Sequence, residues 1–154
     1  MQVEGFCDAS CSGNPGPGAA AAILVALEGS LVARELEIVS EVTPQTTNQR
    51  EELKAGLLIL EQLKRPTRLT ITSDSRYLVD GMTRWLTGWV RKGWKTAGGG
   101  PVANQDLWLR LQELAARHDV TWQWVKGHAG HPYNERCDRL AVAAVRRWQQ
   151  ERRG

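Results

Sequence analysis

The feature that most constrains the fold is an unbroken apolar run at residues 19–27. It is far shorter than the roughly 20 residues that a helix needs to cross a bilayer, and turn-forming residues follow it at 28–30. It therefore predicts a buried strand at residues 20–27, with residues 31–38 returning as the next strand. A chain of 154 residues with 42% hydrophobic content can bury one core around this strand.

The order of the remaining elements predicts an α/β fold with a mixed sheet. Period-two patterns indicate strands, and periods near 3.6 indicate helices. The other expected strands are residues 3–8, 69–73 and 120–125, and the expected helices are one starting at Asn48, residues 75–89, residues 105–118 and one capped by Asn134. Residues 40–47 are expected to be polar loop. Three strands followed by alternating helices and strands are typical of a mixed sheet flanked by helices.

Four acidic residues lie where a charge is costly unless it has a function. Asp8 ends the first apolar strand just before a turn, and Asp74 directly follows the strand at residues 69–73. An acid at a strand end is also a common N-cap or turn residue. Neither position alone therefore identifies a site.

Helical geometry separates Glu52 from its neighbour Glu51. With Asn48 as the N-cap, Glu51 stands three residues later, as in a capping box, and projects toward water. Glu52 projects close to Gly56 and Ile59, at the edge of the apolar arc. In the last helix, Asp138 lies in the same way at the rim of an apolar face.

These four acids predict a metal centre if the sheet and helices bring them together. Converging carboxylates raise one another's pKa unless a cation neutralises them. A hard divalent ion such as Mg²⁺ suits such oxygen ligands, and two ions about 4 Å apart support in-line phosphodiester cleavage. A zinc site built from His128, His131 and Cys137 is disfavoured, because their spacing is not that of a paired structural site.

Charge is distributed unevenly along a chain that is only mildly basic, with 20 Lys and Arg against 17 Asp and Glu. No acid occurs between Asp80 and Asp106, although four basic residues do: Arg84, Arg91, Lys92 and Lys95. Such a window suits a polyanion, or is simply a solvated surface. A second basic cluster, at residues 146–153, can equally be interpreted as a solvated surface.

Cysteine use and the N-terminal residues predict an intracellular protein. The chain has three cysteines, an odd number without the spacing of a disulfide scaffold, which favours a reducing cytoplasm. Polar residues such as Gln2 and Glu4 interrupt what would be the apolar core of a signal peptide. We expect a cytoplasmic monomer without a membrane segment or an obligate protein partner.

Four local strings resemble type 1 ribonuclease H, most nearly the bacterial housekeeping enzymes. They are residues 6–18 (FCDASCSGNPGPG), 46–53 (TTNQREEL), 72–77 (TSDSRY) and 124–138 (WVKGHAGHPYNERCD). They occur in the family's order, and the match runs from about residue 1 to residue 148. The resemblance implies a single catalytic domain over residues 1–148, followed by a short basic tail at residues 149–154.

The resemblance also implies a fold, a reaction and a set of site residues. The fold is a five-stranded mixed sheet, three antiparallel strands plus two parallel, flanked by helices. The reaction is cleavage of the RNA strand of an RNA–DNA hybrid with two Mg²⁺ ions, which Mn²⁺ can replace, leaving a 5′-phosphate and a 3′-hydroxyl.

The implied metal ligands are Asp8, Glu52, Asp74 and Asp138, and His128 is expected to assist catalysis or product release. The implied substrate contacts are Cys11, Asn14, Asn48, Gln49 and Arg76 in the minor groove, Thr47 and Asn104 at a DNA phosphate, and Trp85, Arg91, Lys92 and Lys95 on a basic protrusion.

The chain departs from the family pattern at several of these positions. Gln45 replaces an arginine near the DNA phosphate, Gln49 an asparagine and Arg76 a glutamine, while glycines at 98–100 dilute the basic protrusion. These changes bear on substrate grip and cleavage preference. Two other functions remain in competition: a catalytically silent hybrid-binding module, and a related nuclease or strand-transfer domain that acts on DNA.

Overall fold

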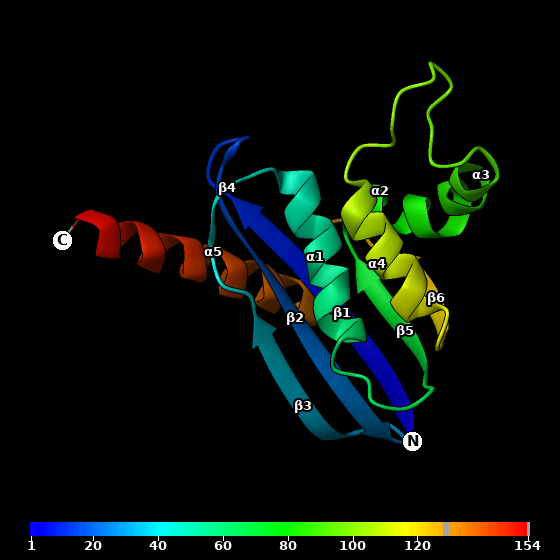
Figure 1. Cartoon of the computed structure of the whole chain (residues 1–154). Helices are drawn as coiled ribbons and strands as arrows, with labels where there is room; N and C mark the ends of the chain where they lie inside the picture. The colour runs from blue at the N-terminus through cyan, green and yellow to red at the C-terminus, as the bar shows by residue number, and fades with distance from the viewer. Residues whose placement is uncertain (128–129, 154) are drawn as a thin grey trace.

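A computed structural model describes residues 1–127 and 130–153 and shows a mixed sheet with helices on both faces (Figure 1). The strands are β1 (Gln2–Cys11), β2 (Gly16–Glu28), β3 (Leu31–Val39), β4 (Thr43–Thr46), β5 (Arg68–Ser73) and β6 (Asp119–Trp124). Their order is β3-β2-β1-β5-β6, with β4 paired to β2. The pairs β1–β2, β2–β3 and β2–β4 are antiparallel, and β1–β5 and β5–β6 are parallel. The five expected strands are confirmed, and β4 is an addition.

The helices are α1 (Asn48–Leu60), α2 (Arg76–Asp80), a π-helical turn η1 (Gly81–Trp85), α3 (Leu86–Arg91), α4 (Gln105–Ala115) and α5 (Pro132–Arg153). Side chains that alternate along β1 and β2 divide the interior into two cores. Cys7 and Ala22 pack with residues of α1 and α4, whereas Ala21 and Ile23 pack with α5. Strand β2 is therefore buried on both faces, as its continuous apolar run indicates.

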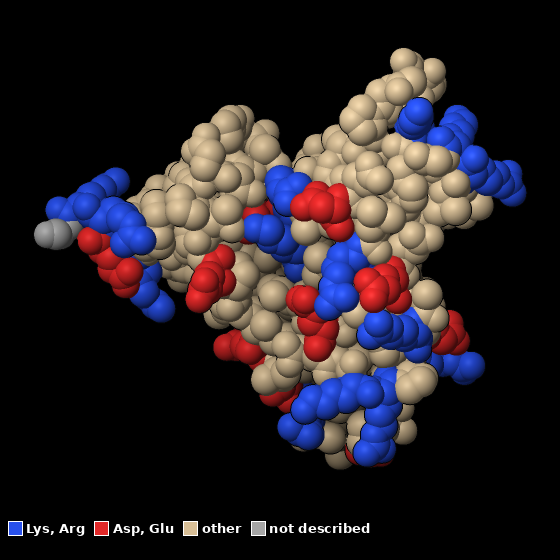
Figure 2. Space-filling model, viewed as in Figure 1, with Lys and Arg blue, Asp and Glu red and all other residues tan. Residues whose placement is uncertain are grey.

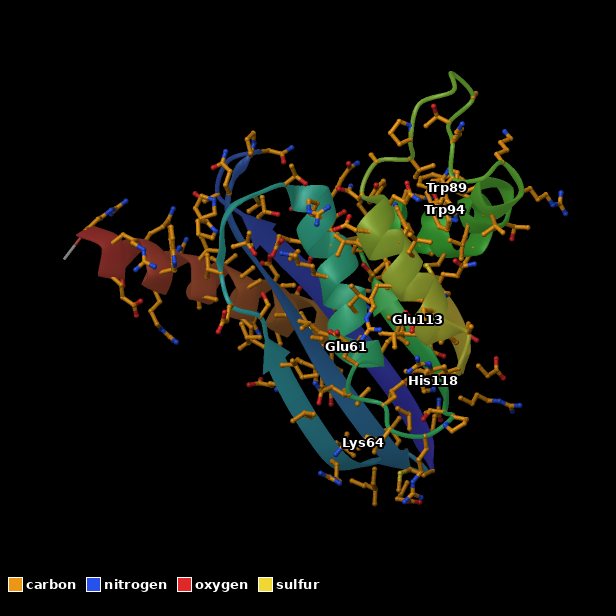
Figure 3. The ribbon with its side chains drawn as sticks, in the orientation of Figure 1. Glu61, Lys64, Trp89, Trp94, Glu113 and His118 are labelled. Atoms are coloured by element: carbon orange, nitrogen blue, oxygen red, sulfur yellow. The ribbon has the colours of Figure 1, made fainter. Side chains whose placement is uncertain are left out.

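The helix expected at residues 75–89 is confirmed as a helical stretch without a break over residues 76–91, and it contains the π-helical turn η1. Gly81 faces the ring of Trp108 so closely that a Cβ there would lie 2.0 Å from Trp108 Cη2. Trp108 also packs against Trp89, which in turn contacts Trp94 with 5.9 Å between ring centroids (Figure 3). Trp89, Trp94 and Trp108 thus form an aromatic core that supports the basic protrusion.

The start of α1 differs from the expectation by one residue, and Glu51 lies in a different environment from the one expected. Thr47 is the N-cap, since its side chain accepts a hydrogen bond from the Arg50 backbone N–H at 3.2 Å. Glu51 is fully buried instead of facing water. Its Oε2 accepts a hydrogen bond from Thr46 Oγ1 at 2.9 Å and lies 2.8 Å from Lys54 Nζ. The prediction that Glu51 is an exposed capping partner was wrong.

The last helix begins earlier and ends later than expected. It starts at Pro132, so Asn134 is not its cap but a buried residue of its first turn. It continues to Arg153, so residues 149–153 are helical and do not form the separate tail that we expected. Among the described residues, no helix is long and apolar enough to cross a membrane.

Glu51 should be a stability determinant, which can be tested against an exposed glutamate at the other end of α1. Glu51→Ala removes the acceptor of Thr46 and leaves Lys54 without its buried partner, so the free energy of unfolding should fall by about 3 kcal/mol. Glu61→Ala, at a side chain that is 44% exposed, should change it by less than about 0.5 kcal/mol. Urea denaturation of both variants measures the difference, and equal values would contradict the burial of Glu51.

Candidate active site

Parallel pairing of β1 with β5 brings two of the four acids to one edge of the sheet. Cys7 pairs with Ser73 at the end of the ladder, so the next residues, Asp8 and Asp74, emerge side by side. Asp8 is only 8% exposed, and its Oδ1 accepts a hydrogen bond from the Ala9 backbone N–H at 2.8 Å. Strand register therefore places Asp8 beside Asp74. The prediction that the first strand ends at Asp8 was wrong, because pairing with β2 extends β1 to Cys11.

The segment that follows β6 passes directly over Asp74. A Cβ at Gly127 would lie 2.8 Å from Asp74 Oδ2, so a larger residue would push that carboxylate aside. On its other side, Trp124 donates from its ring N–H to the Asp74 carbonyl oxygen at 3.0 Å. Neither Gly127 nor Trp124 was among the predicted site residues, although both belong to the string at residues 124–138.

Glu52 reaches the same edge from the first turns of α1. Its Oε2 accepts a hydrogen bond from Ser75 Oγ at 2.7 Å, and its Oε1 accepts one from Asn48 Nδ2 at 3.1 Å. Ser75 follows Asp74 in the chain and is the N-cap of α2. The Ser75 hydroxyl thus caps the N-terminus of α2 and also holds the Glu52 side chain close to the end of β5.

Asp138 approaches from the opposite face of the sheet, on α5. The preceding residue, Cys137, is buried, and its thiol donates to the Phe6 carbonyl oxygen at 3.4 Å. This contact joins α5 to β1 two residues before Asp8. Asp138 is near enough to Asp8 that its charge raises the pKa of Asp8.

The electrostatics of the four acids show that they interact. Burial, followed by the neighbouring charges of Asp74 and Asp138, raises the pKa of Asp8 to about 8. Burial also raises the pKa of Glu52, and the charge of Asp74 adds to this rise, while the Ser75 hydrogen bond opposes it. No group of three or more His, Cys, Asp or Glu side chains within residues 1–127 and 130–153 is placed to hold a metal ion. The acids are therefore electrostatic neighbours.

The predicted minor-groove residues lie around the acids on three segments. Asn14, in the β1–β2 turn, accepts a hydrogen bond from the Asn48 backbone N–H at 3.1 Å. Cys11 lies beside them, with its Sγ 3.6 Å from the Thr46 carbonyl oxygen, and Gln49 is exposed next to Asn48. Arg76 lies on the other side of Asp74, with its guanidinium carbon 3.8 Å from the centroid of the Trp124 ring.

Thr47 and Asn104, predicted to contact one phosphate, are joined by a residue that the sequence analysis missed. Arg50 Nη1 donates to Asn104 Oδ1 at 3.2 Å, and the Arg50 backbone N–H donates to Thr47. Asn104 has a positive φ of 59° and also donates to the Tyr77 hydroxyl at 3.0 Å. Arg50 stands three residues after Thr47, but its link to Asn104 depends on tertiary structure that spacing does not reveal.

The basic protrusion is a separate surface. Arg91, Lys92 and Lys95 are exposed on α3 and the segment after it, and Trp85 is 38% exposed at their base. Figure 2 shows the basic side chains of this region gathered at one extremity of the molecule. A hollow of about 280 Å³ lies between Trp85, Lys92 and Lys95. His128, predicted to assist catalysis, lies outside the described residues.

Comparisons with known proteins agree over nearly the whole chain. The model of the RNase H family matches residues 1–146. The ribonuclease H of Ruegeria pomeroyi is 51% identical over 145 residues, which cover 94% of this chain and 93% of that protein. The ribonuclease H of Pelobacter propionicus is 52% identical over 143 residues, covering 93% and 84% of the two chains.

Solved structures show the same fold. LC9-RNase H1, a type 1 RNase H with the type 2 active-site motif, matches with a TM-score of 0.80 and 36% identity over 94% of this chain and 72% of its own. LC11-RNase H1, crystallised in complex with RNA/DNA hybrid, matches in fold with a TM-score of 0.70 and 16% identity over 96% and 99% of the two chains.

The raised pKa of Asp8 predicts how stability should depend on pH without metal. A folded-state pKa above the unfolded value means that the contribution to stability is present below about pH 4 and is lost as pH rises toward 8. In EDTA, the thermal midpoint should therefore fall by up to about 5 °C between pH 6 and pH 8. Asp8→Asn should remove most of this slope, and Asp119→Asn, at an exposed aspartate, should leave it unchanged. Retention of the full slope in Asp8→Asn would assign it to another group.

Proposed function

The chain belongs to the ribonuclease H family, and from that premise we propose a role for each residue at the carboxylate edge of its sheet. It is an endonuclease that degrades the RNA of RNA–DNA hybrids. We propose that Asp8, Glu52, Asp74 and Asp138 are its catalytic carboxylates. The observation that carries this proposal is the register of β1 on β5, which sets Asp8 beside Asp74 at the edge that Glu52 and Asp138 also reach.

The family depends on divalent metal ions. Here the proposed ligands are all carboxylate oxygens, the donor type of Mg²⁺ sites, so we propose two Mg²⁺ ions, with Mn²⁺ able to replace them. Asp8, Glu52, Asp74 and Asp138 would hold such ions, which would supply activation of a water molecule and stabilisation of the leaving oxygen, for cleavage to a 5′-phosphate and a 3′-hydroxyl. Without metal, the negative charges near Asp8 repel one another and raise its pKa. With cations bound, the same negative charges would attract the ions and hold them in the site.

The chain's own residues keep these carboxylates in position. Ser75 and Asn48 hold both oxygens of Glu52, so its side chain is oriented before substrate arrives. Gly127 leaves the space that Asp74 occupies. We propose that His128, in the segment next to Gly127, assists catalysis or product release.

Hybrid recognition is proposed to divide between the two strands. Cys11, Asn14, Asn48, Gln49 and Arg76 surround the carboxylates and would face the minor groove. There the RNA strand exposes 2′-hydroxyls to polar side chains, whereas a DNA strand lacks these hydroxyls. This is the physical basis for requiring RNA at the cut strand.

For the DNA strand, we propose a phosphate site between Thr47, Asn104 and Arg50. Arg50 is oriented there by its bidentate pair with Asp106, at 3.0 and 2.8 Å. Its guanidinium would be a hydrogen-bond donor to the phosphate, although Asp106 balances its charge and Gln45 replaces the family arginine. Trp85, Arg91, Lys92 and Lys95 would hold the same strand further along. We also propose that the protein acts as a monomer in the cytoplasm, where its three free thiols would stay reduced.

Substrate choice tests this function directly. End-labelled RNA should be cut when it is paired with DNA and Mg²⁺ is present, and EDTA should abolish the cutting. Duplex RNA and duplex DNA of the same sequence should remain intact over the same period. Equal cleavage of duplex DNA would contradict the proposal and favour a strand-transfer type of domain.

Glu52→Gln tests the carboxylate assignment. The substitution keeps the volume and an acceptor for Ser75 but removes the charge, so hybrid cleavage should fall by at least about 100-fold. Without metal, the thermal midpoint should hold or rise, because repulsion by Asp74 is relieved. Glu61→Gln, at the exposed C-terminal end of the same helix, should retain full activity. A fully active Glu52→Gln protein would remove Glu52 from the site.

A further inference from the structure

The C-terminal half of α5 carries a basic cluster that the proposed active site does not use. Its members are Arg146, Arg147, Arg152 and Arg153, with Glu151 as the one acid among them. All four arginines are exposed, and none takes part in an ion pair with another described residue. Figure 1 shows this end of α5 extending beyond the sheet, and Figure 2 shows its basic side chains at the extremity opposite the protrusion.

Helical geometry relates this cluster to the carboxylates. Gln149 follows Asp138 by 11 residues, which at 100° per residue returns to within about 20° of the same side of the helix. Arg152 lies within about 40° of that side, whereas Arg147 points about 180° away. The side of α5 that presents Asp138 to the site therefore presents Gln149 and Arg152 further along.

A hydrogen bond joins this side of α5 to the β1–β2 turn. Gln149 Nε2 donates to Ser12 Oγ at 3.1 Å. Ser12 is next to Cys11 and two residues before Asn14, both proposed to face the minor groove. The arginines that follow Gln149 thus lie just beyond a turn that would contact the hybrid.

Arg152 is held in place by an aromatic contact. Its guanidinium carbon lies 4.6 Å from the centroid of the Trp148 ring. Stacking reduces the side-chain freedom that would be lost on binding and leaves the edge of the guanidinium free for two hydrogen bonds to a phosphate. An arginine positioned in this way is suited to a sugar–phosphate backbone.

We propose that Arg152 and Arg153 form a second binding surface for the phosphate backbone of the same RNA–DNA hybrid, an inference that rests on the proposed function. Arg152 is 14 residues beyond Asp138, or about 21 Å along the helix at 1.5 Å per residue. At about 3.4 Å per nucleotide, this corresponds to roughly six nucleotides from the cut. The hybrid would then be held at both ends, by the protrusion on one side of the carboxylates and by α5 on the other.

A purely structural role for these arginines predicts a different result. Cations in the last turn of a helix stabilise it through the helix dipole, by about 0.3–1 kcal/mol. That role would lower the thermal midpoint of a variant without changing the salt dependence of hybrid binding. Salt dependence is therefore the property to measure.

The test is fluorescence anisotropy of a labelled 24-base-pair RNA–DNA hybrid in EDTA, where no cleavage occurs. For Arg152→Gln/Arg153→Gln, affinity at 100 mM salt should fall by about three- to tenfold, and the slope of log affinity against log salt should become shallower by up to about 1.8, or 0.9 per phosphate contact. A 10-base-pair hybrid, with about five base pairs on either side of its centre, should show a much smaller loss. Replacing both arginines with lysine should restore most of the salt slope.

Two controls remove positive charge elsewhere. Lys64→Gln/Arg65→Gln changes two charges after α1, and Arg147→Gln changes one charge on the opposite side of α5; both should bind as the unmodified protein does. An unchanged slope in Arg152→Gln/Arg153→Gln, or an equal loss in the controls, would overturn the inference. Cleavage of the hybrid by the unmodified protein is measured separately. An absence of cleavage would count against the proposed function, whereas an unchanged salt slope would count only against the surface formed by Arg152 and Arg153.

Discussion

Parallel pairing of β1 with β5 is the constraint on which the rest of the structure depends. Two parallel strands run toward the same edge of the sheet, and here the β1–β5 ladder ends at the Cys7–Ser73 pair, with an aspartate next in each chain segment. The pairing therefore forces together two charges that repel, and burial makes the repulsion costly, as the raised pKa of Asp8 shows. The two cores on either side of β1 supply the stability that allows this arrangement to persist.

Local patterns were enough to predict the order of the strands and helices and to choose the four acids. Alternation, turn residues and helix periodicity are properties of neighbouring residues, so one sequence displays them. The convergence of Asp8 with Asp74 required the strand register, which no local pattern contains. It was expected only because four strings resembled a known family.

The errors have long-range causes. Strand β4 is only four residues long and contains Pro44, so it shows no strand pattern until β2 pairs with it. Glu51 was assigned to the surface because it projects away from the leucines of α1, but β2 and β4 cover that side of the helix and Thr46 of β4 is its partner. The π-helical turn begins at Gly81, which packs against Trp108, 27 residues later, and helix periodicity does not predict such a turn. In each case, the deciding contact joins segments that the local pattern treats separately.

The aromatic core connects two surfaces that would otherwise be independent. The Tyr77 hydroxyl accepts hydrogen bonds from both Asn104 and Trp108, and Trp108 packs against Trp89 at the base of the protrusion. The residues proposed to hold a DNA phosphate and those proposed to hold the strand further along therefore rest on the same rings. A change in this core would alter the spacing between the two surfaces as well as the stability of each.

The origin of the acids along the chain has a consequence for protein synthesis. Asp8 comes from the first strand and Asp138 from the last helix, 130 residues apart in the sequence. A nascent chain whose α5 is still inside the ribosome can pair β1 with β2 but has only part of its carboxylate set. The proposed hydrolytic centre thus requires a residue made 130 positions after its first carboxylate, so nuclease activity is expected only after α5 has emerged and packed on the sheet.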